Sequence, residues 1–155
     1  MIKRIFIGTL AFAVVVGVLN AGDIPGVNLA LNAKATASSQ EGDATPAAKV
    51  TDGNYYSRWA SQHRDPQWIM LDLGKPKTFS CIVLFWENAY STDYKLEISD
   101  DGKTWKTIHV QKNGQGKIED IYLKKNVTAR YFRVYSEKRA TGYGVSLHEI
   151  QLFVK

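Results

Sequence analysis

Residues 49–57 read KVTDGNYYS and carry the oxygen donors that a calcium ion needs. Calcium takes about 6 to 8 hard oxygen ligands, and a turn containing glycine lets backbone carbonyls and one carboxylate converge on a point. Here Gly53 follows Asp52 directly. The alternative is that Asp52 and Gly53 form an ordinary turn and that Glu149, far along the chain, is an exposed strand residue. The residues alone leave both interpretations open.

Three other segments place polar side chains next to aromatic ones, namely residues 62–64, 86–90 and 138–143. Sugars offer hydroxyl groups for hydrogen bonds and C–H faces for stacking on aromatic rings, so these segments could bind carbohydrate. Each side chain also has a simpler possible role, as a solvated charge, a cap or a half-buried support. The cations Arg64, Lys138 and Arg139 fall within these segments, and charge-assisted hydrogen bonds from Arg suit a ligand that bears carboxylates.

Catalysis is not predicted. A glycosidase needs two carboxylates at a controlled separation, one with a raised pKa, and Glu87 and Asp93 are the only such pair near these segments. No nucleophile elbow, metalloprotease helix or phosphate-binding glycine loop is present. The histidines His63, His109 and His148 lack the spacing of zinc ligands.

The chain has 155 residues and a formal net charge of +5, which allows one domain. Lys3 and Arg4 precede an apolar stretch over residues 5–19, and Ala21 is a small residue at the expected cut, which is the layout of a signal peptide. The stretch is shorter than the roughly 20 residues that span a membrane, so an anchor is the less favoured alternative. We predict a signal peptide at 1–21, a leader at 22–27 and one domain at 28–155.

Loss of the signal peptide leaves 18 basic and 15 acidic residues, a net charge of +3. This mild basicity gives no reason to expect a nucleic-acid or membrane partner. The single cysteine, Cys81, has no intrachain partner for a disulfide and is expected to be a buried core thiol. We expect a monomer that is periplasmic, or secreted.

The elements that must position these residues are strands. Ile69, Leu71 and Leu73 alternate with polar or larger residues, and residues 79–86 are apolar on both faces, as in a covered central strand. Residues 94–99 alternate with Lys95, Glu97 and Ser99 outward, and run through Asp100-Asp101-Gly102 into another strand, which indicates a hairpin. The tryptophans Trp59, Trp68 and Trp105 are assigned to core or hairpin packing.

Further strands are expected at residues 118–123, 129–137 and 145–154. In the last strand the apolar phase of Val145 and Leu147 differs from that of Ile150, Leu152 and Val154, so we expect a bulge or bend near His148 and Glu149. The fold class predicted is all-β, a β-sandwich jelly roll of about eight antiparallel strands.

Six segments, taken in order, resemble the coagulation-factor-type C, or discoidin, domains and within them the family 32 carbohydrate-binding modules of bacteria. They are NLALNAKATASSQEG, AAKVTDGNYYSRWAS, DPQWIMLDLG, KLEISDDGKTWKTI, ARYFRVY and YGVSLHEIQLF, and together they cover nearly the whole mature chain. The resemblance implies a β-sandwich that holds one structural calcium ion and binds its ligand in loops at one end.

The resemblance also implies roles for particular residues. The calcium ligands would be the Asp52 carboxylate, the carbonyls of Lys49 and Asn54, the Ser57 hydroxyl, and Glu149. The sugar-binding candidates are His63, Arg64, Asn88, Tyr90, Arg139 and Tyr143. Gln40 and Glu41 belong to a loop that often borders such a site, and Trp86 and Glu87 would support it from below.

We therefore predict an exported, non-catalytic protein that binds an acidic polysaccharide, with polygalacturonate (pectin) as the specific ligand. One alternative is a lectin for neutral galactose or N-acetylgalactosamine, which would need fewer cations. Another is an adhesion module for anionic membranes. Such modules need exposed apolar loop tips, for which only Tyr55 and Tyr56 are candidates.

Overall fold

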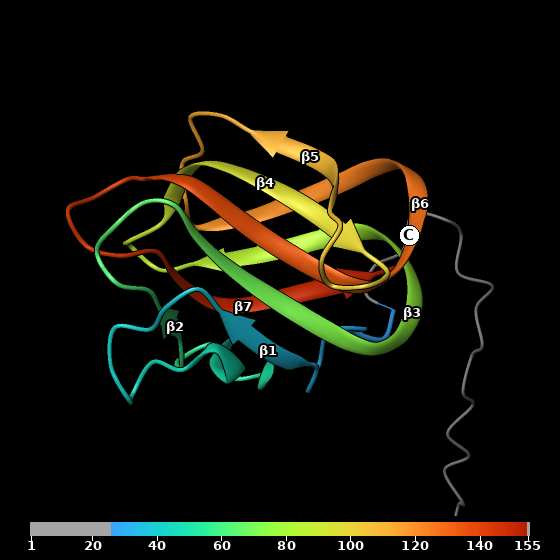
Figure 1. The fold of residues 1–155 in the computed structure, drawn as a ribbon, viewed down its shortest axis with the longest axis horizontal. Coiled ribbons are helices and arrows are strands. Elements are labelled where there is room, and N and C mark those ends of the chain that lie inside the picture. Colours follow the sequence, from blue (N-terminus) through green and yellow to red (C-terminus); the bar gives the residue numbers. More distant parts are fainter. Residues whose placement is uncertain (1–25, 155) are drawn as a thin grey trace, which may run out of the picture.

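The computed structural model describes residues 26–154, and the expected signal peptide lies outside them (Figure 1). Seven strands and one short 3-10 helix follow in the order β1 (Lys34–Ala37), η1 (Ala47–Thr51), β2 (Trp59–Ala60), β3 (Gln67–Trp86), β4 (Ser91–Ser99), β5 (Lys106–Gln111), β6 (Ile118–Arg139) and β7 (Ser146–Phe153). Within this part of the chain no helix is long and apolar enough to cross a membrane.

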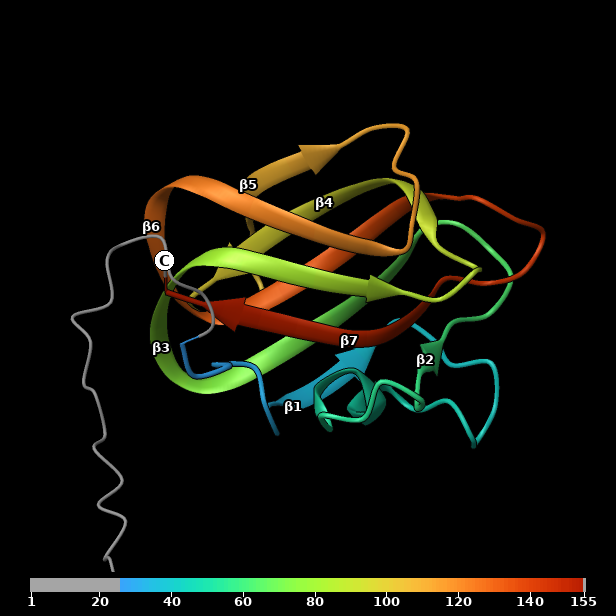
Figure 2. The same cartoon turned by 180° about the vertical axis from the view of Figure 1, so that it is seen from behind.

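The strands pair antiparallel in the order β2-β7-β3-β6-β4-β5, and β1 pairs with β3. The first part of β3 pairs with β1 and with the second part of β6, as in the pairing of Ile69 with Val134. Its second part pairs with β7 and with the first part of β6, as in the pairing of Ile82 with Ile121. Figures 1 and 2 show both long strands bending from one layer of the sandwich into the other.

The predicted all-β sandwich is confirmed. Residues 67–86 form one strand where two were expected, and residues 118–139 likewise. The short strands β1 and β2, which were not predicted, bring the total to seven. Each long strand supplies one strand to each layer, so the layers are joined by continuous backbone as well as by their common core.

The core lies between the layers, where the predicted inward residues Ile69, Leu71 and Leu73 are buried. In the second part of β3, Ile82 and Leu84 also face this core. The side chains on the other face of this part of β3 form a smaller cluster with Phe153 from β7. This cluster includes Cys81, which is buried as predicted. The continuous apolar run from residue 79 therefore corresponds to a strand covered on both faces.

The hairpin between β4 and β5 forms at the expected turn, and its outward face is more covered than its alternation indicates. The side chain of Glu97 is buried because Arg133 donates to its carboxylate at 2.6 Å and the Arg133 guanidinium lies 4.2 Å from the centre of the Trp105 ring. Trp105 thus packs on the hairpin and Trp59 is fully buried, whereas Trp68 is only half-buried.

The expected irregularity in the last strand is present as a register shift in β7. Phe85 pairs with Glu149 while the next residue, Trp86, pairs with Leu147, so His148 is the extra residue of a bulge. Glu149 is completely buried, and Val154, which was assigned to the same phase as Ile150, lies beyond the strand and is half-exposed.

Candidate functional site

Oxygen atoms from residues 49–57 crowd around the hydroxyl group of Ser57. Its Oγ lies 2.9 Å from both carboxylate oxygens of Asp52, 2.9 Å from the carbonyl oxygen of Asn54 and 3.5 Å from that of Lys49. A hydroxyl has one proton and satisfies only one of these acceptors at a time. Four of the five predicted calcium ligands therefore lie together in an oxygen cluster that favours a cation. The Lys49 ammonium group, 3.3 Å from Asp52, is a cation already paired with it.

The fifth predicted ligand, Glu149, belongs to the bulge of β7. Neither of its carboxylate oxygens accepts a hydrogen bond of normal geometry within the described residues, although the Gly53 amide lies close enough to favour the charged form. Burial raises the pKa of Glu149 to about 7 against the partial opposition of the Gly53 amide, and the nearby Asp52 carboxylate adds to the rise. A buried carboxylate without a partner is costly, and a metal ion would remove that cost.

The loop is attached to β7 by a contact between the ring nitrogen Nδ1 of His148 and the carbonyl oxygen of Ser57, at 2.8 Å. Across residues 26–154 no group of three or more His, Cys, Asp or Glu side chains gathers as a metal site. A cation here would thus be held by two carboxylates together with neutral hydroxyl and carbonyl oxygens. This all-oxygen set suits calcium better than zinc, which prefers nitrogen and sulfur.

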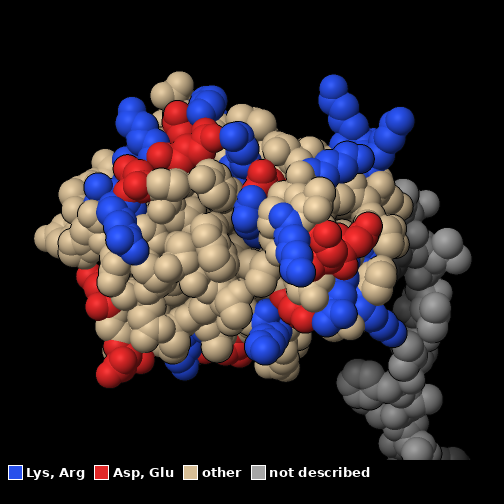
Figure 3. All heavy atoms as spheres, in the orientation of Figure 1, with Lys and Arg blue, Asp and Glu red and all other residues tan. Residues whose placement is uncertain are grey.

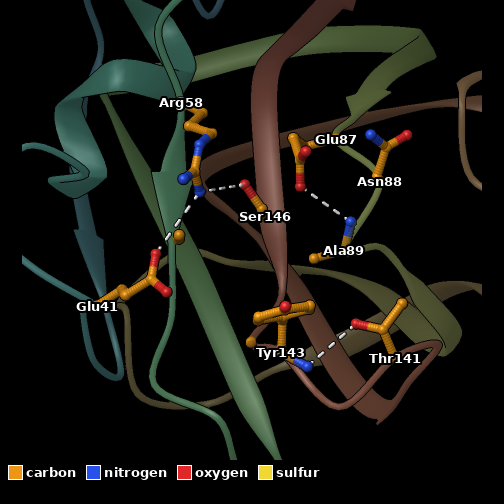
Figure 4. A pocket seen from close by; sticks show the side chains of 10 residues that line it. Glu41, Arg58, Glu87, Asn88, Ala89, Thr141, Tyr143 and Ser146 are labelled. Atoms are coloured by element: carbon orange, nitrogen blue, oxygen red, sulfur yellow. Dashed lines mark hydrogen bonds and ion pairs between the residues drawn. The ribbon is translucent and has the colours of Figure 1, made fainter.

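A cavity of about 420 Å³ opens at the loop end of the sandwich, between the loop after β3 and the loop before β7 (Figure 4). Its lining comes from these two loops, from β2 and its preceding residue, from the start of β7, and from the loop after β1. The lining residues are Glu41, Arg58, Ala60, Glu87, Asn88, Ala89, Thr141, Tyr143, Gly144 and Ser146.

Tyr143 is the aromatic side chain of the cavity and is 68% exposed. The Arg139 guanidinium holds its loop in place by donating to the Tyr143 carbonyl at 2.9 Å and pairing with Asp65 at 3.2 Å. Next in the chain, Gly144 packs so closely on Ser61 that an added Cβ would lie 2.1 Å from the Ser61 carbonyl oxygen. The loop is therefore held by contacts to its own backbone atoms. These contacts do not use the Tyr143 ring, which can face a ligand.

The cavity carries more negative than positive charge. Arg58 lies 3.3 Å from the Ser146 hydroxyl and 3.7 Å from Glu41, whose other oxygen contacts His63 at 3.1 Å. Glu87 accepts a hydrogen bond from the Ala89 amide at 2.9 Å and has no ion-pair partner in the described chain. One carboxylate is thus balanced by neighbouring side chains, and a second faces the cavity without a cation (Figure 4).

Two of the six sequence-predicted sugar-binding residues, Asn88 and Tyr143, line the cavity. His63 lies at its rim, with its ring edge-on to Tyr143 at 5.7 Å between centroids. Arg64 is exposed outside the lining, and Tyr90 packs its ring against Gly116. The sixth, Arg139, supports the loop and points to Asp65.

Some lining residues were not predicted, and others were predicted to have a lesser role. Arg58, which directly precedes the buried Trp59, was not predicted, and neither were Thr141 and Ser146. Glu87 and Glu41, expected below or beside the site, face the cavity itself. Asp93, considered with Glu87 as a pair of carboxylates, bonds instead to Lys112 outside this cavity.

Comparison with solved structures shows similarity to carbohydrate-binding modules. The chain is 41% identical to chitosan-binding module 1 from a chitosanase/glucanase of Paenibacillus sp. IK-5, with a TM-score of 0.79, over 83% of this chain and 99% of that one. Module 2 of the same enzyme, solved with chitotriose, is 39% identical with a TM-score of 0.79, over 81% and 99%. A family 32 module of Clostridium perfringens NanJ, solved with galactose, is 20% identical with a TM-score of 0.69, over 78% and 93%, and shows the fold alone.

Among curated proteins, the chain resembles the polysaccharide lyase 8 family protein HylA of Enterococcus faecalis. The two are 35% identical over 68 residues, which is 44% of this chain and 5% of that protein. The model of the F5/8 type C domain matches residues 34–150. This range includes β1 to β6, β7 through its bulge, the oxygen cluster and the cavity. By this match the chain belongs to the F5/8 type C, or discoidin-like, domain family.

Proposed function

We propose that this protein is a non-catalytic carbohydrate-binding module whose loop-end cavity binds an amino-sugar polysaccharide of the chitosan type. The observation that carries the proposal is the charge of the cavity, in which Glu41 and Glu87 outnumber the single Arg58. Deacetylated glucosamine residues carry an ammonium group, and a carboxylate that faces the cavity without a cation is a suitable acceptor for it.

The remaining side chains of the cavity fit a sugar chain. The exposed ring of Tyr143 offers a stacking surface for the C–H face of one sugar residue. Asn88, Thr141 and Ser146 supply amide and hydroxyl groups for hydrogen bonds to sugar hydroxyls. The similarity to a module solved with chitotriose gives independent support.

Binding of polygalacturonate in this cavity has less support. The prediction depended on Arg64, Lys138 and Arg139, none of which lines the cavity, and Arg139 is engaged with Asp65 and the Tyr143 carbonyl. The similar modules are a chitosan-binding module solved with chitotriose and a family 32 module solved with galactose, and neither supports polygalacturonate as the ligand. A neutral galactose ligand stays the alternative, since the fold is shared with a module solved with that sugar.

Titration calorimetry with small oligosaccharides tests the proposal. We expect chitotriose to bind and its fully N-acetylated counterpart to bind at least about tenfold more weakly, because acetylation removes the charge that the carboxylates recognise. Equal binding of both, or binding of galactose alone, would overturn the amino-sugar assignment. Reducing-end assays on chitosan should show no cleavage, and release of new ends would contradict the non-catalytic role.

We also propose that the oxygen cluster of residues 49–57 and Glu149 holds a structural calcium ion. The crowded acceptors around Ser57 and the unpartnered carboxylate of Glu149 support this. The bound ion would supply a charge that ties the loop after η1 to β7. Metal analysis of protein purified without chelator should find about one calcium per chain, and its absence at saturating calcium would contradict the proposal.

The N-terminal segment supports a further proposal, that the protein is exported to the periplasm or the medium. Its basic start, apolar stretch and small residue at Ala21 favour cleavage there. N-terminal sequencing of protein recovered from cell fractions would check this, and an intact N-terminus in the cytoplasm would oppose it.

A further inference from the structure

We propose that a second, separate site, the groove between β5 and the bend of β6, binds an anionic polysaccharide such as a polyuronate. This groove has a volume of about 470 Å³. It is lined by Lys106, Thr107, Ile108, His109, Tyr122, Leu123, Lys124, Lys125 and Val127, and it shares no residue with the loop-end cavity. We refer to it as the lysine groove.

The lysine groove lies away from the loop end. The bend of β6 and the start of β5 are at one end of the sandwich, and the loops after β3 and before β7 are at the other (Figure 1). Figure 3 shows basic side chains projecting together over the bend of β6, without an acidic side chain between them. A polymer bound there would therefore leave the loop-end cavity open.

The lining of the lysine groove is positively charged. Three lysines line it and no carboxylate does. Within residues 26–154, Lys106, Lys124 and Lys125 form no ion pair, whereas Lys95 and Lys112 on the neighbouring face are both paired with Glu137. Lys106 also borders a neighbouring hollow that contains Asp100 and Asp101, so Lys124 and Lys125 are the lysines most available to an external anion. Because each residue of a polyuronate carries one carboxylate, several lysines in one groove could engage one chain together.

The uncharged lining favours a sugar polymer over other polyanions. Ile108, Leu123 and Val127 form a half-buried apolar floor packed against the core, and Tyr122 is 51% exposed at its edge. This gives a sugar ring an apolar surface beneath the lysine ammonium groups. A nucleic acid strand would need a series of aromatic rings on which successive bases stack, and the groove has one tyrosine.

An anionic membrane fits the lysine groove less well. A membrane-binding tip needs exposed apolar side chains that enter the lipid. The bend of β6 carries Lys124, Lys125, Asn126, Val127 and Thr128, of which the one apolar side chain is half-buried against the core. The lysine groove is therefore built to bind along its surface and has no side chain to insert.

Affinity electrophoresis and titration with polygalacturonate at low ionic strength test the proposal. The test variant is Lys106→Gln/Lys124→Gln/Lys125→Gln. The matched control, Lys34→Gln/Lys117→Gln/Lys138→Gln, removes the same charge from exposed lysines outside the lysine groove. We expect the test variant to bind about tenfold more weakly and the control to bind within about twofold of the natural protein. Binding should weaken as salt is added.

Two further measurements separate the lysine groove from the loop-end cavity and from loss of folding. Chitotriose binding should be unchanged in the test variant, and Lys106→Arg/Lys124→Arg/Lys125→Arg should retain polygalacturonate binding because it keeps the charge. An equal loss of binding in test and control variants, or no binding by the natural protein, would overturn the proposal. Stronger, groove-dependent binding to phosphatidylserine vesicles or single-stranded DNA than to polygalacturonate would also overturn it.

Discussion

The loop-end cavity and the lysine groove belong to the same sandwich and have opposite charge. In the cavity, Arg58 lies between Glu41 and Ser146, so its charge is partly used inside the site. In the lysine groove no carboxylate is present to engage Lys106 or Lys124. The difference shows that the mild net basicity of the chain is unevenly distributed. The ligand that we propose for each site follows from its local charge and not from the total.

The largest expected effect concerns the buried carboxylate of Glu149 in the β7 bulge, which lies outside the lining of the lysine groove. Its pKa is raised to about 7 by burial, above its ordinary value of 4.5. Without metal, Glu149 binds its proton more tightly in the folded state than in the unfolded state. This difference stabilises the folded state fully below about pH 4.5, and the stabilisation is lost as the pH rises through about 7. The loss is roughly 3 kcal/mol, and urea unfolding in chelator across this pH range would measure it.

Excess calcium should remove this pH dependence, because the ion binds the ionised carboxylate, and Glu149→Gln should flatten it in chelator. Chelation should also weaken chitotriose binding, since the loop of residues 52–57 leads directly to Arg58 in the cavity, and it should leave the lysine groove unaffected. A free energy of unfolding in chelator that does not change with pH would contradict the assigned environment of Glu149.

The replacement Tyr143→Ala should weaken chitotriose binding by about 2 kcal/mol, or roughly 30-fold, because it removes the stacking surface of the cavity. Titration calorimetry would measure this, with polygalacturonate binding as the internal reference for the lysine groove. Tyr56→Ala is the matched control, since Tyr56 is 96% exposed outside the cavity. Equal effects of the two replacements would exclude Tyr143 as the stacking residue.

A smaller effect is expected for Glu87→Gln, which preserves shape and an oxygen acceptor for the Ala89 amide. Chitotriose binding should weaken by about 1.4 kcal/mol, or tenfold, while binding of the N-acetylated trimer should not change. Asp43→Asn, which removes one exposed acidic charge outside the cavity lining, controls for net charge. If both ligands lose affinity equally, the carboxylate does not recognise the ammonium group.

The smallest effects compare the two arginines that were predicted to bind sugar. Arg139→Gln should lower the free energy of unfolding by about 1 kcal/mol and chitotriose affinity about threefold, because the Tyr143 loop loses a carbonyl contact and the pairing with Asp65. Arg64→Gln should change both by less than about twofold in affinity or 0.5 kcal/mol in stability, since the side chain is exposed. A larger loss of chitotriose affinity in Arg64→Gln would show that Arg64 contributes to sugar binding.

The alternation of apolar residues was sufficient to predict most strands and the bulge at His148, because a buried face requires a period of two and any slip moves side chains to the other face. It did not predict that β3 and β6 continue through both layers. The segments between the expected strands, such as Gly74-Lys75-Pro76, have the composition of a turn, and only pairing across the sandwich shows that the chain bends there without leaving the sheet.

The candidate site was only partly predictable for a related reason. Loop composition correctly indicated Asn88 and Tyr143, which line the cavity. It also indicated Arg64 and Arg139, which do not. The Arg139 side chain points to Asp65, a residue remote in sequence, and the Arg64 side chain is exposed to solvent. Arg58 directly precedes β2 and Ser146 begins β7. The two strands pair with each other, although Arg58 and Ser146 are 88 positions apart in the chain. No local pattern relates them.

The sequence by itself determined the fold class, the family and the oxygen donors of residues 49–57, because these depend on residue type and on spacing within one segment. The tertiary structure alone decided that Glu149 lies buried without a partner, that Glu87 faces a cavity, and that three unpaired lysines share one groove. The charge available to a ligand depends on which opposite charges lie within a few ångströms, and those distances are fixed by packing between remote segments of the chain.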